Sequence, residues 1–151
     1  MTKTSLIKAI SVVSLLLIGS LTSTQASDDE AAVRQIAMNY LLGFYYGKTE
    51  LLEQALSPEL KKLGWGTRRE NGERGGPYHM SRERALQYEH DEELSESAHK
   101  KVIVFEVLDK VASVKVEAVW GIDYMHMAKN DGKWQIYNVI WQSWPDGQAV
   151  D

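Results

Sequence analysis

The C-terminal half of the chain alternates apolar and polar residues, a pattern typical of β-strands. Asn130-Asp131-Gly132 separates the last two alternating runs. An Asp-Gly pair at such a place is among the strongest hairpin signals, because glycine adopts the positive φ that the turn needs. Gly121 interrupts the alternation and indicates a bulge or a bend. The pattern predicts an antiparallel meander with strands at Val102 to Leu108, Ser113 to Ala118, Ile122 to Ala128 and Lys133 to Trp141.

The N-terminal half of the chain shows helical spacing of its apolar residues. A first helix is predicted to begin near Ser27, with acidic residues in its first turn and a buried stripe that reaches Phe44. Ser57-Pro58-Glu59 resembles a further helix start, since proline is favoured at the first helical position. Helices followed by a meander indicate the α+β class. Other predicted elements are short helices from Thr49 and from Ser81, edge strands at Thr67 to Glu70 and Tyr78 to Met80, and a loop from His90 to Lys100.

The first residues of the chain have the pattern of a signal peptide. Lys3 and Lys8 are followed by a short apolar run, Ala9 to Ile18, which is well below the ~20 residues that span a membrane. Thr24-Gln25-Ala26 fits a cleavage site with small residues at the −3 and −1 positions. We expect a signal peptide over residues 1–26, cut after Ala26, one domain over residues 27–151, and a periplasmic or secreted protein. An uncleaved N-terminal anchor is the alternative.

Composition excludes several function classes. The chain has no cysteine, so disulfides and thiolate chemistry are absent. The formal net charge is −4, and loss of Lys3 and Lys8 with the signal peptide takes it to −6. An acidic chain without a basic stripe is a poor candidate for nucleic acid or an anionic membrane. The four histidines show no metal-ligand spacing, and there is no nucleophile elbow, phosphate loop or dinucleotide fingerprint, so we expect neither metal nor cofactor.

Four stretches of the sequence carry a family resemblance: Ala37 to Lys48, Ala112 to Glu117, Asp123-Tyr124 and Asp131 to Ile136. They resemble the nuclear transport factor 2-like superfamily, and within it the putative lumazine-binding family. The resemblance implies a cone, in which a strongly curved antiparallel sheet wraps a long N-terminal helix, as in cystatin-like folds. It also implies a pocket for one small apolar molecule at the open end, and many relatives form dimers through the outer face of the sheet.

Strand parity assigns residues to the two faces of the hairpin. With a two-residue turn, one face holds Asp123, Met125, Met127, Trp134, Ile136, Asn138 and Ile140. The other face then holds Ile122, Tyr124, His126, Tyr137, Val139 and Trp141. The resemblance places the Trp134 face inside the cone. A three-residue loop would instead bring Tyr124 and His126 inside.

These faces give the candidate site. An inward Asp123 would be desolvated and could act as a general acid or base, as a carboxylate does in ketosteroid isomerase-like relatives. The alternative is a purely structural Asp123 whose oxygens are satisfied by hydrogen bonds. Aromatic residues with a few polar groups suit a flat ring system. The candidate ligand-binding residues are Tyr40, Phe44, Trp65, Tyr78, Tyr88, Trp134 and Asn138.

Three functions remain open at this point. The first is an exported protein that binds a small apolar or aromatic ligand. The second is an isomerase or cyclase that uses Asp123. The third is a protein-interaction module that docks a partner on the outer aromatic residues Tyr124, Tyr137 and Trp141. An apolar outer face of this kind usually marks an interface, and it predicts a homodimer.

Overall fold

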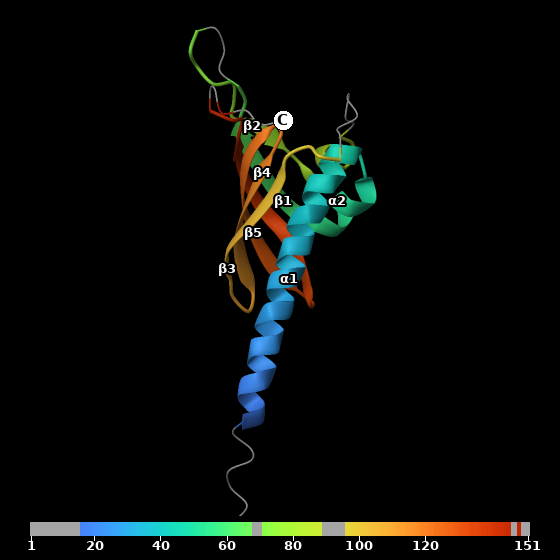
Figure 1. Ribbon diagram of the computed structural model, residues 1–151. Helices are drawn as coiled ribbons and strands as arrows, with labels where there is room; N and C mark the ends of the chain where they lie inside the picture. The colour runs from blue at the N-terminus through green and yellow to red at the C-terminus, as the bar shows by residue number, and fades with distance from the viewer. Residues whose placement is uncertain (1–15, 68–70, 89–95, 146–147, 149–151) are drawn as a thin grey trace, which may run out of the picture.

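In a computed structural model of the protein, the structure describes residues 16–67, 71–88, 96–145 and 148, with side chains described from residue 25 onward. A long helix lies against one face of a curved, unclosed sheet of six strands, and two short helices follow it (Figure 1). This arrangement confirms the predicted α+β class. The elements are α1 Leu16–Tyr46, α2 Thr49–Ala55, β1 Leu56–Trp65, β2 Tyr78–Met80, α3 Arg82–Leu86, β3 Lys100–Val107, β4 Val111–Ala118, β5 Gly121–Asn130 and β6 Lys133–Gln142.

The strands follow the order β2-β1-β6-β5-β4-β3 across the sheet. Strand β1 pairs in parallel with β6, and the other neighbouring pairs are antiparallel. The predicted meander is therefore confirmed, with ends within three residues of those expected. The core forms between the inner face of the sheet and α1, whose buried residues recur at helical spacing: Val33, Ala37, Tyr40, Leu41 and Phe44.

Several boundaries differ from the predictions. Helix α1 begins at Leu16 rather than near Ser27, and its N-terminal part extends past the end of the sheet (Figure 1). Helix α3 begins after Ser81 as predicted, because the Ser81 hydroxyl accepts a hydrogen bond from the Arg84 amide. Most of the predicted loop at His90 and of the edge strand at Thr67 lies outside the described residues.

The helix predicted at Ser57-Pro58-Glu59 is wrong, because this segment belongs to strand β1. The chain from Lys61 to Trp65 lies between β6 on one side and β2 on the other. Pairing on both edges outweighs the local preference of a Ser-Pro-Glu start, since propensity is a weak prior against tertiary contacts. The correction matters for function, because a strand at this position points Lys62 inward.

The hairpin between β5 and β6 has the predicted two-residue turn. Asn130 pairs with Lys133, and the two turn residues have positive φ, 47° at Asp131 and 76° at Gly132. These values are those of a type I′ turn, whose twist matches the flanking strands. The parity near the turn is therefore as predicted, with Met127 and Ile136 both buried.

Farther along β6 the predicted parity is wrong. Met127 pairs with Ile136 but His126 pairs with Asn138, so Tyr137 is an extra residue in a bulge. One extra residue exchanges the two faces of the strand. Val139 and Trp141 therefore face inward, whereas Asn138 and Ile140, which were expected inside, lie on the outer face.

Asp29 ties helix α1 to the hairpin. Its Oδ1 accepts hydrogen bonds from Lys129 Nζ at 2.6 Å and from Trp134 Nε1 at 3.0 Å. The bond from Lys129, and then that from Trp134, lowers the pKa of Asp29 below its usual 3.8. Charge-assisted bonds of this kind are stronger than neutral ones.

We expect the fold to lose part of its stability in acid through this contact. A carboxyl whose pKa is lowered in the folded state contributes stability above its unfolded pKa, and that contribution disappears as the pH falls through the folded value. Unfolding in urea at a series of pH values from about 6 to 3 measures the loss. An Asp29→Asn variant should be less stable near pH 6 and should show a flatter pH dependence. An unchanged slope in this variant would contradict the assignment.

Candidate functional site

A cavity of about 160 Å³ opens between the C-terminal half of α1 and the inner face of the sheet. Its walls are largely aromatic, and the rings meet edge to face, the favoured geometry for aromatic pairs. Helix α1 contributes Tyr40 and Phe44, which are about one turn apart, so both side chains point to the same side of the helix. The lining residues are Tyr40, Phe44, Lys62, Met80, Tyr88, Trp120 and Trp141.

Lys62 is the charged residue of the cavity wall. It is 7% exposed, and its Nζ donates a hydrogen bond to the Tyr40 hydroxyl at 2.6 Å and lies 3.4 Å from Asp123 Oδ1. The ammonium also lies 5.3 Å from the ring centre of Tyr40 and 5.4 Å from that of Trp141, within cation–π range. A buried cation is therefore held by one carboxylate and several ring faces.

Asp123 lies behind the cavity wall, fully buried. Its Oδ2 accepts hydrogen bonds from the Tyr40 hydroxyl at 3.0 Å and from Trp120 Nε1 at 3.1 Å, and its Oδ1 faces Lys62. The residue itself does not line the cavity. The inward direction predicted for Asp123 is confirmed, and its contacts match the structural alternative more closely than a free general base.

Burial controls the ionisation of this cluster. Desolvation lowers the pKa of Lys62 below its usual 10.5, although the Asp123 charge opposes that shift. Desolvation, together with the Asp123 charge, raises the pKa of Tyr40 well above 10. Tyr40 therefore stays a neutral hydroxyl that links the lysine to the carboxylate.

The structure brings together only some of the predicted ligand-binding residues. Tyr40, Phe44 and Tyr88 line the cavity. Tyr78 lies next to it, stacked on Trp141 with 6.5 Å between ring centres. Trp65 is outside the lining, on β1 beyond the cavity.

Trp134 and Asn138 lie elsewhere. Trp134 is buried against Asp29 and borders a separate groove between α1, α2 and β6. Asn138 is on the outer face because of the β6 bulge, 3.2 Å from His126 Nδ1 and bonded to the Lys61 carbonyl. Neither side chain reaches the cavity.

Four lining residues were not predicted: Lys62, Met80, Trp120 and Trp141. Lys62 lies between Leu60 and Gly64 in the alternating burial of β1, but the residues Leu60 to Leu63 do not alternate between apolar and polar, so the sequence carried no signal for an inward lysine. Trp141 was assigned to the outer face, and only the bulge at Tyr137 turns it inward. Trp120 lies in the two-residue connection that Gly121 closes, so the bend predicted at Gly121 is a tight turn.

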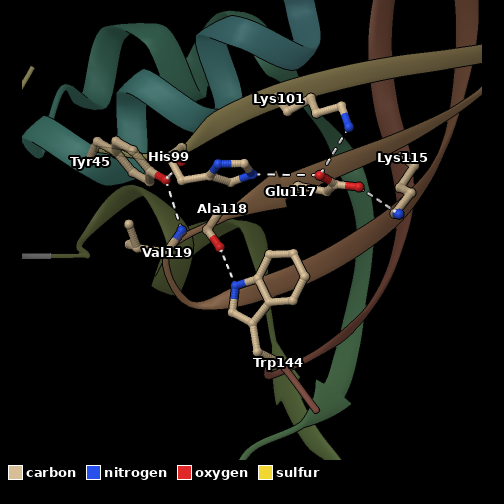
Figure 2. Close-up of polar contacts among 8 residues, drawn as sticks. All are labelled: Tyr45, His99, Lys101, Lys115, Glu117, Ala118, Val119 and Trp144. Carbon is tan, nitrogen blue, oxygen red and sulfur yellow. Dashed lines mark hydrogen bonds and ion pairs between the residues drawn. The ribbon is translucent and has the colours of Figure 1, made fainter. Parts of the chain in front are cut away.

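A second polar cluster fixes this turn from the other side (Figure 2). The Tyr45 hydroxyl donates to the His99 carbonyl and accepts from the Val119 amide at 2.9 Å. Trp144 Nε1 donates to the Ala118 carbonyl at 2.7 Å. These bonds hold both residues that precede Trp120, and so they position its indole at the cavity.

Figure 2 also shows Glu117 between Lys101, Lys115 and His99. The bond from Lys115, 2.7 Å long, lowers the pKa of Glu117 below its usual 4.5. None of these four side chains lines the cavity, so the cluster is a structural tie between β3 and β4. In the described part of the chain, no group of three or more acidic, histidine or cysteine side chains is placed to hold a metal ion.

Comparison with solved structures places the fold. An NTF-2 like protein of unknown function from Silicibacter pomeroyi DSS-3 shares 18% identity at a TM-score of 0.60, covering 78% of this chain and 98% of its own. An NTF2-like protein of unknown function from Shewanella baltica OS155 shares 14% identity at a TM-score of 0.60. The match covers 80% of this chain and 97% of that protein. A domain of unknown function with a cystatin-like fold, from Nostoc punctiforme PCC 73102, shares 13% identity at a TM-score of 0.54. The match covers 81% of this chain and 81% of that domain. These likenesses confirm the nuclear transport factor 2-like, cystatin-like fold.

Curated proteins gave no significant match to this sequence. Of the helices that the structure describes, none is both long enough and apolar enough to cross a bilayer.

A sequence profile of the family described as Putative lumazine-binding matches residues 28–142, which include every residue of the cavity wall. The fold and this match support a small-molecule-binding role, and the chain belongs to the putative lumazine-binding family.

Proposed function

We propose that the protein binds a small, neutral, flat ring compound in the aromatic cavity, with Lys62 as the hydrogen-bond donor that orients it. The observation that carries this proposal is the wall itself, which consists of five aromatic side chains, one methionine and one ammonium group. Apolar walls with a few placed polar groups are typical of ligand pockets. The family description, which names lumazine, supports a flat heterocycle with ring carbonyls.

The charge and size of the cavity narrow the ligand class. The Lys62 charge is balanced by Asp123, so a charged ligand would enter a site that is already neutral. A closed apolar cavity of ~150 Å³ holds one benzene ring. Here the volume is about 160 Å³, and Tyr88, which is 42% exposed, forms part of the rim, so a second fused ring can extend outward.

The contacts of Asp123 favour binding over carboxylate catalysis. Two neutral donors and Lys62 already occupy the carboxylate, and Tyr40, Lys62 and Trp120 stand between it and the cavity. A general base must reach the proton that it removes. Asp123 therefore acts as a positioning residue that holds three groups of the wall.

Ligand binding should quench the fluorescence of the two tryptophans in the wall, because a flat ring in the cavity contacts Trp120 and Trp141. Titration with lumazine and with quinoline, followed by tryptophan emission and by the shift in melting temperature, measures binding. We expect saturable quenching and a concentration-dependent rise in melting temperature. The Trp141→Phe variant should lose about half of the quenching.

Trp65→Phe is the matched control, because Trp65 lies outside the wall, on β1 beyond the cavity. This variant should retain the quenching of the unmodified chain. Failure of every flat ring compound to quench the emission or to raise the melting temperature would overturn the proposal.

Export and dimerisation belong to the same proposal. Asp29 is the first buried residue among the described side chains, and the four residues around the expected cut, 25–28, are exposed, which supports cleavage after Ala26. N-terminal sequencing of the protein recovered from the cell envelope or medium would test the cut.

The outer face of the sheet carries three exposed apolar side chains, Phe105, Tyr124 and Ile140, and the rings of Phe105 and Tyr124 stack with 6.5 Å between their centres. Exposed apolar area of this kind supports a homodimer, which sedimentation would detect.

A further inference from the structure

The amine of Lys62 is the cationic group of the aromatic cavity wall. Burial of its side chain leaves 6% exposed, and the ring centres of Tyr40, Phe44 and Trp141 lie 5.3–5.8 Å from Nζ. The hydrogen bond to Tyr40 is short, 2.6 Å, whereas the contact with Asp123 is 3.4 Å. The amine is thus fixed at one point of the wall, with its neighbours arranged around it.

Asp123 keeps its own hydrogen bonds when Lys62 loses a proton. Tyr40 and Trp120 both donate to Oδ2, at 3.0 and 3.1 Å, and neither bond depends on the ammonium. A carboxylate that accepts two such bonds stays satisfied inside the fold. When the amine is neutral, the carboxylate is therefore still stabilised by two hydrogen bonds.

We propose that Lys62 captures an aromatic aldehyde or ketone in this cavity as a Schiff base, an activity that rests on the proposed ring-binding function. The ammonium first gives a proton to solvent, and the nitrogen lone pair then attacks the carbonyl carbon. The new carbon–nitrogen bond becomes double as the carbon–oxygen bond breaks. The oxygen leaves as water with the two remaining amine protons, so the step needs no further reactant.

Two features of the site favour this reaction. Desolvation lowers the pKa of Lys62, so that more of the reactive amine is present near neutral pH than at a surface lysine. The Tyr40 hydroxyl lies 2.6 Å from Nζ and is itself held by Asp123, so it fixes the position of the amine at the cavity wall. Once formed, the Schiff base nitrogen can take up a proton and restore the charge pair with Asp123.

Reductive trapping tests the proposal on the full chain. The protein is incubated near neutral pH with benzaldehyde and sodium cyanoborohydride, which reduces the imine to a stable secondary amine, and the adduct is located by mass spectrometry of peptides. We expect Lys62 to carry the first and largest share of the adduct. Lys129 serves as an internal comparison, because it also pairs with a buried carboxylate, Asp29 at 2.6 Å, but does not line the cavity.

Variants and a competitor give the controls. Lys62→Arg keeps a cation beside Asp123 but cannot form an imine, and it should lose the early adduct, whereas Lys129→Arg should retain it. Benzyl alcohol has the same ring without a carbonyl, and an excess should lower labelling at Lys62 and leave Lys129 unchanged. If Lys62→Arg does not fold, the peptide map of the unmodified chain still decides the question.

The outcomes separate the two proposals. Binding of benzyl alcohol together with adduct concentrated on Lys62 supports both. Binding of benzyl alcohol with adduct spread evenly over the lysines overturns the Schiff base and leaves the ring-binding function standing. Absence of any ring binding together with an unlabelled Lys62 overturns both.

Discussion

Replacing Asp123 by alanine is expected to destabilise the fold by about 3–5 kcal/mol, because removal of one partner leaves a buried ammonium without its counter-charge. The carboxylate is fully buried and faces Lys62, whose side chain is 6% exposed. Tyr40 and Trp120 would also lose the acceptor for their hydrogen bonds. Urea unfolding followed by circular dichroism measures the loss as a fall in the midpoint.

Two further variants separate the charge from the hydrogen bonds. Asp123→Asn keeps an acceptor for Tyr40 and Trp120 but removes the charge, so its loss should be smaller than that of Asp123→Ala. A Lys62→Met, Asp123→Asn double variant removes both charges and should be more stable than Asp123→Ala, since buried ion pairs are often replaceable by apolar groups. If Asp123→Ala costs less than about 1 kcal/mol, the pair is not desolvated as the structure indicates.

Near the turn, local chemistry was enough to predict the hairpin from the sequence. Asp131-Gly132 adopts the two-residue turn, and the register next to it places Met127 and Ile136 in the core as expected. The bulge at Tyr137 is not visible in the residue pattern, because Tyr137 is as acceptable in a regular strand as in a bulged one. The prediction therefore holds for the first residues of β6 and fails for Asn138 and Trp141.

The site depends on contacts that no local pattern encodes. Lys62 occupies an inward position only because β1 pairs with β6, which follows it by about 70 residues in the chain. The Ser-Pro-Glu signal that predicted a helix describes local preference, and tertiary pairing overrides it. Asp123 was predicted because the alternation in its strand showed which residues face inward. Its partner Lys62 was missed because β1 was predicted as a helix, so no inward face was assigned to it.

Gly121→Ala is expected to cost about 3 kcal/mol or more, since it combines backbone strain with overlap of backbone atoms. Gly121 has φ of 145°, a conformation that side-chain-bearing residues rarely adopt. A Cβ there would overlap the Gln142 carbonyl and lie 2.7 Å from Ser143 Cα, both of them backbone atoms that cannot rotate away. The midpoint of urea unfolding measures the cost.

Gly132→Ala is the matched control for this variant. Gly132 also has positive φ, 76°, but a Cβ there meets nothing within 4 Å, so it should cost only the strain of about 1–2 kcal/mol. Gly121 also closes the turn that carries Trp120, whose indole both bonds to Asp123 and forms part of the cavity wall. Gly121→Ala should therefore weaken quenching by a ring ligand as well, whereas Gly132→Ala should leave it unchanged. Equal losses of stability in the two variants would show that a small backbone shift relieves the overlap at Gly121. Unchanged ligand quenching in Gly121→Ala would show that the Trp120 indole does not move when the backbone at Gly121 shifts.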